Sequence, residues 1–107
     1  MFFFGSKPES VCDNGQGVVR KVLGHEGHMM IVLNDFEQGA VGALHSHPHE
    51  QTTYVLSGRF LFTIGDEQHE VGPGDSLHKN PNVVHGCTCL EKGSLLDVFT
   101  PIREDFL

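Results

Sequence analysis

Hydrophobic residues along this chain fall into short segments that glycine, proline, asparagine and aspartate interrupt. Such segments, bounded by turn formers, predict short β-strands. The expected strands are Val18–Leu23, Met29–Phe36, Val41–His45, Gln51–Ser57, Arg59–Ile64, Gln68–Val71, Asp75–His78, Val83–Leu90 and Leu95–Phe99. No sustained helical period occurs apart from one final turn expected after Pro101. The pattern therefore predicts an all-β chain.

Many short antiparallel strands leave edges that a stable domain must cover, and a jelly-roll barrel of two sheets covers them. We expect this fold in a single domain over residues 1–107, because no repeat, low-complexity tract or linker divides the chain. Residues 1–17 are expected to form an N-terminal arm. Its apolar run Met1–Phe4 is too short for a signal peptide or a membrane span. We expect this run to be a strand that packs on the barrel or on a partner subunit of a homodimer.

Two histidines, His45 and His47, lie at the end of the expected strand Val41–His45. Side chains alternate along a strand, so residues two apart direct both imidazoles to one face. Gln51 opens the next strand with an amide oxygen that can turn back toward them, and His85 follows in a second block. Three imidazoles and an oxygen donor can bind one divalent ion such as Zn, Ni, Mn, Fe or Cu. In a chain with eight histidines, one pair could also be a surface coincidence.

The chain is acidic, with 7 lysine and arginine residues against 14 aspartate and glutamate residues and a formal charge of −7. This balance disfavours nucleic acid and anionic membranes as partners. A small acidic molecule can still bind where a cation or a buried arginine reverses the local field.

The cysteines, Cys12, Cys87 and Cys89, form no framework of paired spacings, which indicates a reduced, cytoplasmic setting. Cys87 and Cys89 share the strand face of His85. They could supply soft metal ligands or serve as small buried hydrophobic residues.

Glycines and polar residues around the histidines resemble the two motifs of the cupin superfamily. The first motif is matched by Gly39, His45, His47, Gln51 and Gly58, with Gln51 where a glutamate is usual. The second is matched more loosely by Gly74, Asn80, Asn82, His85 and Cys89. Asn82 replaces a turn glycine, which asparagine can do because it tolerates a left-handed backbone. The resemblance implies a single-domain cupin barrel.

Longer segments are similar to the KdgF group of pectin-degradation cupins. These segments are His45–Gln51, Gly72–Ser76, Pro81–Gly86 and Leu95–Phe106. In that group the enzyme opens the ring of unsaturated uronic acid monomers from pectin or alginate to give linear keto acids. The resemblance implies metal ligands at His45, His47, Gln51 and His85, and substrate-site residues at Asp97, Phe99 and Arg103. It therefore implies a metal-dependent, isomerase-like enzyme that acts on a small anionic sugar acid.

The residue types suit this implied reaction. Gln51 in place of glutamate leaves only neutral ligands, so the ion keeps its full charge as a Lewis acid and anion receptor. Arg103 could hold a substrate carboxylate through a two-pronged guanidinium contact, and Asp97 near a cation is a suitable proton carrier. On residue type alone, Asp97 could instead lie at an exposed edge, Phe99 in the core and Arg103 in solvent.

Two other functions stay open at this stage. A metal-dependent dioxygenase could use the same histidines, although Gln51 departs from the two-histidine, one-carboxylate set that non-haem iron oxygenases favour. A cupin that only binds a metal and a sugar acid would need no proton carrier, and Asp97 would be dispensable.

Overall fold

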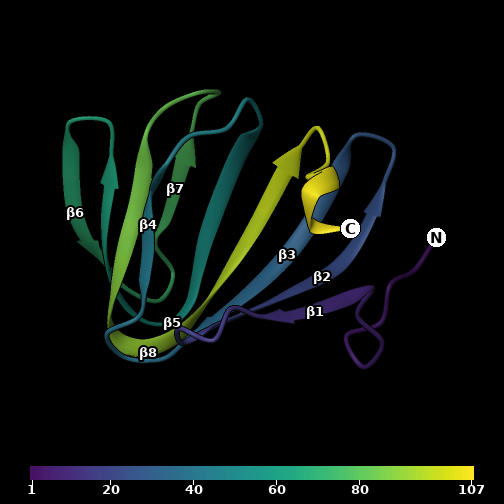
Figure 1. Ribbon diagram of the computed structural model, residues 1–107, viewed down its shortest axis with the longest axis horizontal. Coiled ribbons are helices and arrows are strands. Elements are labelled where there is room, and N and C mark those ends of the chain that lie inside the picture. The colour runs from purple at the N-terminus through teal and green to yellow at the C-terminus, as the bar shows by residue number, and fades with distance from the viewer.

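The computed structural model describes residues 1–107 as antiparallel β-strands with one short helix (Figure 1). The strands are β1 (Ser10–Asp13), β2 (Val18–Glu26), β3 (Met29–Phe36), β4 (Val41–His45), β5 (Glu50–Ile64), β6 (Glu67–Val71), β7 (Ser76–Lys79) and β8 (His85–Thr100). The 3-10 helix η1 (Glu104–Phe106) is the final turn expected after Pro101. No helix is long and apolar enough to cross a membrane. The all-β fold class is confirmed.

The two longest strands, β5 and β8, run through both sheets of the barrel. The first part of β5 pairs with the last part of β8, while its second part pairs with the beginning of β8. Beside these paired strands, β3, β2, β1 and β7 extend one sheet, and β4 and β6 extend the other. In Figure 1 the sheets diverge from the bends in β5 and β8 toward an open end. Because β8 bends midway, both of its ends return to this open end.

The predicted strand boundaries are wrong at these bends. The sequence pattern places turns at Gly58 and Gly93, whereas one strand continues through each. Gly58 has a φ of +81°, and a Cβ there would lie 2.5 Å from the backbone oxygen of Glu91. A Cβ on Gly93 would overlap the backbone oxygen of Ser57. Glycine here lets two strands bend against each other without ending either strand.

A substitution at this bend should lower stability strongly. Gly58→Ala must adopt a left-handed backbone and push its Cβ into rigid backbone, so we expect a loss of about 2 kcal/mol or more in unfolding free energy. Gly74→Ala is the matched control, because Gly74 has a φ of +91° but open space around it. Denaturant unfolding of both variants gives the measurement. Equal losses would show that the close approach at Gly58 adds nothing.

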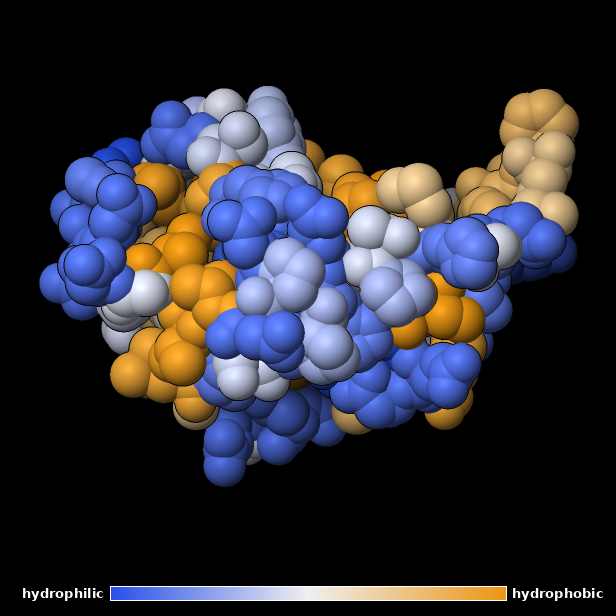
Figure 2. All heavy atoms as spheres, turned by 90° about the horizontal axis from the view of Figure 1, so that it is seen from above, coloured by the Kyte–Doolittle hydropathy of each residue, from blue (hydrophilic) through white to orange (hydrophobic).

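The N-terminal arm also differs from the prediction. Met1–Phe4 does not form a strand; β1 does, pairing with the free edge of β2. The hydrophobic pattern missed β1 because a short edge strand is held by its backbone hydrogen bonds rather than by a buried face. Phe3 packs against Gly24, while Phe2 is 85 % exposed. Figure 2 shows hydrophobic side chains on the segment that projects at the N-terminal end of the molecule.

The hydrophobic core is divided into two clusters. The larger cluster consists of Phe36, Ala40, Val55, Phe60, Phe62, Cys89 and Leu95. The smaller one consists of Val22, Met30, Val32 and Phe99, with Ile102 and Phe106 packed against it. Together these clusters fix the strands whose ends carry the functional side chains.

Candidate metal centre and substrate cavity

A cavity of about 430 Å³ lies between the sheets. Strands β2, β3, β4, β5, β7 and β8 line it, together with the segment that follows β8. Six of the seven site residues predicted from the sequence line this cavity: His45, Gln51, His85, Asp97, Phe99 and Arg103. The seventh, His47, is buried and contacts Gln51. The structure therefore brings all of the predicted residues together.

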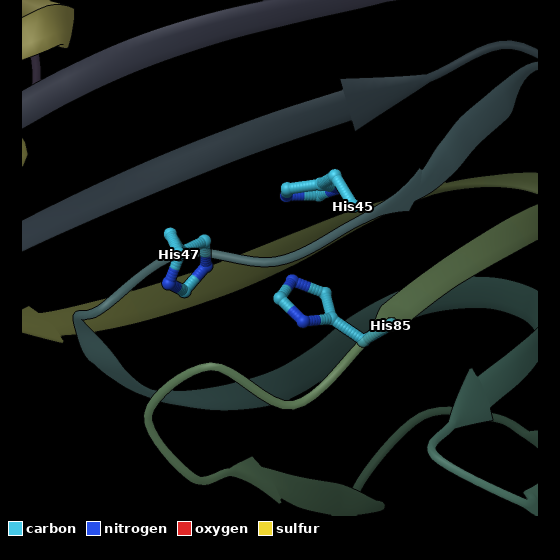
Figure 3. Close-up of side chains that lie close together, drawn as sticks. All are labelled: His45, His47 and His85. Carbon is cyan, nitrogen blue, oxygen red and sulfur yellow. The ribbon is translucent and has the colours of Figure 1, made fainter.

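Three imidazoles converge at the open end of the barrel (Figure 3). His45 ends β4, His85 begins β8, and His47 lies in the loop between β4 and β5. Each ring bonds a backbone carbonyl through Nδ1, at 2.8 Å for His45, 3.0 Å for His47 and 3.1 Å for His85. A carbonyl only accepts, so Nδ1 carries the proton and Nε2 keeps its lone pair. The three ligand atoms lie within 4.8 Å of one another, and the group could hold a metal ion.

The loop between β4 and β5, which carries His47, is joined by a backbone contact to the loop that precedes His85. The amide nitrogen of Asn82, in the loop before His85, donates to the carbonyl oxygen of His47 at 2.8 Å. Asn82 has a φ of +67°, which confirms that it occupies the left-handed position where the resemblance expects glycine. This contact holds the second motif beside the first.

Burial keeps two of the imidazoles neutral. It lowers the pKa of His85 to about 4, with a smaller contribution from the positive charge of Lys79. Burial also lowers the pKa of His47, and the positive charge of Arg103 acts in the same direction. A neutral imidazole is the form that binds a metal.

Gln51 directs its amide oxygen toward the histidine group. Its Oε1 lies 3.0 Å from Nε2 of His47, and its Nε2 donates to Oδ1 of Asp97 at 2.8 Å. The bond to Asp97 fixes which end of the amide faces the histidines. Two lone pairs then face each other across 3.0 Å, an arrangement that a cation between them would stabilise. The donor set therefore fits a divalent ion.

Asp97 is buried inside the barrel and accepts three hydrogen bonds from neutral donors. Its Oδ1 accepts from Gln51 and from the hydroxyl of Thr53, and its Oδ2 accepts from Nδ2 of Asn34 at 2.8 Å. Its exposure is only 3 %, which excludes the solvent-exposed edge considered from the sequence. One lone pair on Oδ2 has no partner within the protein, so the carboxylate can still accept from a substrate hydroxyl.

Arg103 lies at the cavity wall rather than in solvent, with its side chain 12 % exposed. Its guanidinium stacks over the rings of Phe99 and Phe106, at 5.2 Å and 4.2 Å from their centroids. Its Nε and Nη2 bond the carboxylate of Asp105, and this contact lowers the pKa of Asp105. Asp105 thus occupies the edge of the guanidinium formed by Nε and Nη2, and a ligand would contact the edge that carries Nη1. Phe99 is both a core residue and a cavity wall.

Two further basic residues line the cavity and were missed by sequence reasoning. Arg20 stacks on Phe106 at 3.8 Å, and Lys79, 3 % exposed, donates to Oγ1 of Thr53 at 3.0 Å. With Arg103 they make three cations against the single acid Asp97 around the cavity. Alternation could have found both residues, because Arg20 is two residues from Val22 and Lys79 two from Leu77. The cavity lining therefore carries more positive than negative charge, although the chain as a whole is acidic.

The cysteines behave as hydrophobic residues. Cys89 belongs to the core, and Cys87 lines the cavity with its pKa raised to about 11 by burial. A protonated thiol is a poor ligand, and the group that could hold a metal contains histidines alone. Of the two readings of Cys87 and Cys89, the structure favours the small buried hydrophobic residue.

Comparison with known proteins agrees with this architecture. Residues 32–99 match the family described as Cupin domain. The pectin degradation protein KdgF of Dickeya dadantii is 39 % identical over 95 residues, which cover 87 % of this chain and 86 % of the relative. The structure of KdgF from Halomonas sp. superposes with a TM-score of 0.91 at 35 % identity over 100 % of both chains. An RmlC-like cupin from Shewanella frigidimarina gives a TM-score of 0.92 at 39 % identity over 99 % of this chain and 95 % of its own.

The family match includes both motifs and Asp97, and the structural match to KdgF from Halomonas sp. covers the whole chain, including the ending that carries Arg103. The chain belongs to the cupin family and is a relative of the pectin degradation protein KdgF.

Proposed function

We propose that this protein is a metal-dependent enzyme that opens the ring of unsaturated uronic acid monomers, released from pectin or alginate, to linear keto acids. The observation that carries the proposal is the cavity, in which a histidine group faces one buried carboxylate among three cations. Such a lining suits a small sugar acid that must exchange protons. The relatives named for pectin degradation support the same substrate class.

In the proposed metal site, His45, His47 and His85 through Nε2 and Gln51 through Oε1 would hold one divalent ion, Zn, Ni, Mn or Fe. When bound, the ion would supply Lewis-acid stabilisation of negative charge on a substrate oxygen. Asp97 sets the orientation of Gln51 through the 2.8 Å hydrogen bond, so the acid and the metal site are built as one unit.

The proposed reaction is an isomerisation in which protons move and no atom is lost. A base removes the proton of the anomeric hydroxyl, the bond between the anomeric carbon and the ring oxygen breaks, and the ring oxygen becomes an enol oxygen. A proton then adds to the neighbouring alkene carbon, and the enol becomes a ketone. Asp97 is the proposed proton carrier. Arg103 binds the substrate carboxylate through the guanidinium edge that Asp105 leaves free, and Phe99 packs against the sugar ring.

The test is to incubate the metal-loaded protein with unsaturated galacturonate under anaerobic conditions and to follow the ultraviolet absorbance of its double bond. Loss of the absorbance supports the proposal, because the conjugated alkene disappears in the keto acid. Loss only in the presence of oxygen would indicate the dioxygenase instead. An unchanged substrate that nevertheless binds would indicate a cupin that only binds sugar acids.

We also propose a cytoplasmic homodimer. The free state of Cys12, Cys87 and Cys89 supports a reducing compartment.

The outer face of the sheet formed by β2, β3, β8 and β5 carries an apolar strip. The pairing of these strands places the residues of the strip side by side. The strip consists of Ile31, Leu33, Tyr54, Leu56, Leu96 and Val98. A second copy could cover this strip together with the exposed arm.

The arm gives a prediction about assembly. Deleting residues 1–5 should weaken the dimer, and light scattering at micromolar concentration should detect the shift toward single chains. Phe2→Ser with Phe4→Ser should act in the same way, because these rings are 85 % and 65 % exposed on one chain. Phe3→Ser is the contrasting variant, since Phe3 packs on Gly24 of its own chain. A wild-type mass equal to one chain would contradict the dimer.

A further inference from the structure

Lys79 is a charged residue in an environment where lysine is rarely found. It ends β7, opposite Gln51 of β5, and is only 3 % exposed. Lysine almost never lies fully buried without a partner. No carboxylate forms an ion pair with it, and its ammonium group donates one hydrogen bond, to Oγ1 of Thr53 at 3.0 Å. Two of its three donors have no acceptor within the protein.

The two remaining donors belong to a side chain that lines the cavity. Nζ of Lys79 lies 5.0 Å from the centroid of the Phe62 ring and 3.0 Å from Oγ1 of Thr53. The Thr53 hydroxyl donates its own hydrogen bond to Oδ1 of Asp97, since it can only accept from the ammonium group of Lys79. Asp97, Gln51 and His85 line the same cavity as Lys79, so a ligand bound there can accept from the remaining N–H groups.

We infer that Lys79 binds the carboxylate of the substrate, which makes the cavity selective for sugar acids over neutral sugars. The inference rests on the proposed function for the site and adds the residue that recognises the carboxylate of the substrate. Arg103 offers only one edge, because Asp105 occupies its other edge. Lys79 is the buried cation with unused donors, so it can bind one carboxylate oxygen while Arg103 contacts the other oxygen.

Charge coupling supports this role. Thr53 links the ammonium group of Lys79 to the carboxylate of Asp97, and no carboxylate forms a direct ion pair with that ammonium group. A substrate carboxylate in the cavity would supply the ion pair. An acid would gain an ion pair in a region with little water, whereas a neutral sugar would leave the charge unpaired.

The test compares galacturonate with galactose, which differ only in the acid group, by calorimetric titration of metal-loaded protein. Lys79→Met should weaken galacturonate binding at least about 30-fold and leave the weak binding of galactose unchanged. In turnover of unsaturated galacturonate it should raise KM by a similar factor with a smaller change in kcat. Lys79→Gln serves the same purpose if the methionine variant does not fold. Lys21→Met is the matched control, because Lys21 lies outside the cavity with its side chain partly exposed and pairs with Asp35.

Each outcome bears on the inference. Wild-type affinity for galacturonate in a folded, metal-loaded Lys79 variant overturns it, as does an equal loss for both sugars or the absence of galacturonate binding to the wild type. The proposed function fails separately. If the wild type binds galacturonate through Lys79 yet leaves the unsaturated acid unchanged, the inference holds and the enzymatic proposal does not. If turnover proceeds and Lys79→Met keeps the wild-type KM, the reverse is true.

Discussion

Asp97→Asn should lower kcat for unsaturated galacturonate by about 10²–10⁴-fold, the range for loss of an acid–base group, while KM stays near the wild-type value. An amide cannot take up the proton that ring opening releases. Asparagine nevertheless fits the site: its oxygen can accept from Gln51 and Thr53, and Asn34 can turn its own amide to accept from the new NH₂ group. Gln51 should therefore keep its orientation, and the variant should keep its metal.

The control for this variant is Asp75→Asn. Asp75 accepts a hydrogen bond from the backbone of Gly72 outside the cavity, so its loss should affect folding without affecting chemistry. Steady-state kinetics and metal analysis on both proteins give the measurement. An Asp97→Asn protein that converts the uronate at the wild-type rate would show that Asp97 carries no proton in the reaction.

Prediction from the sequence succeeded where local chemistry decides the structure. The β3 and β4 boundaries are as expected, and the polar turn at Gly65 and Asp66 separates β5 from β6. It failed at Gly58 and Gly93, where glycine usually indicates a turn. Whether a strand ends or bends at a glycine depends on the partner strand across the sheet, and the sequence pattern along one strand does not contain that information.

The same distinction applies to the site. Alternation and motif spacing indicated the three histidines and Gln51 as one group, whereas Asp97 was indicated only by the resemblance of the ending Leu95–Phe106. Lys79 was missed because the predicted strand ended one residue earlier, at His78. The pairing of β7 with β5 places Lys79 opposite Gln51, and the side chain of Lys79 lines the cavity. The ion pair of Arg103 with Asp105 likewise depends on the fold of the final turn.

Loss of the metal should have the other large effect. We expect about one divalent ion per chain in the wild type, because three neutral Nε2 atoms and one amide oxygen complete a site of ordinary size. His47→Ala with His85→Ala should abolish metal binding and turnover together. His78→Ala is the matched control, since His78 is exposed on β7 and bonds Thr52 and Glu50. Metal analysis of each protein after loading gives the result, and a wild type that never binds an ion would eliminate the site.

The variant Gln51→Glu distinguishes metal binding from the Lewis acidity of the bound metal. A glutamate can still donate an oxygen to the ion, so the metal should remain and bind more tightly. Its second oxygen, however, would replace the Nε2 group that now donates to Asp97 at 2.8 Å, and two carboxylates would then face each other. The added negative charge would also weaken the Lewis acid and repel an anionic substrate. We therefore expect full metal content with reduced turnover, whereas wild-type turnover would show that the neutral ligand set does not determine activity.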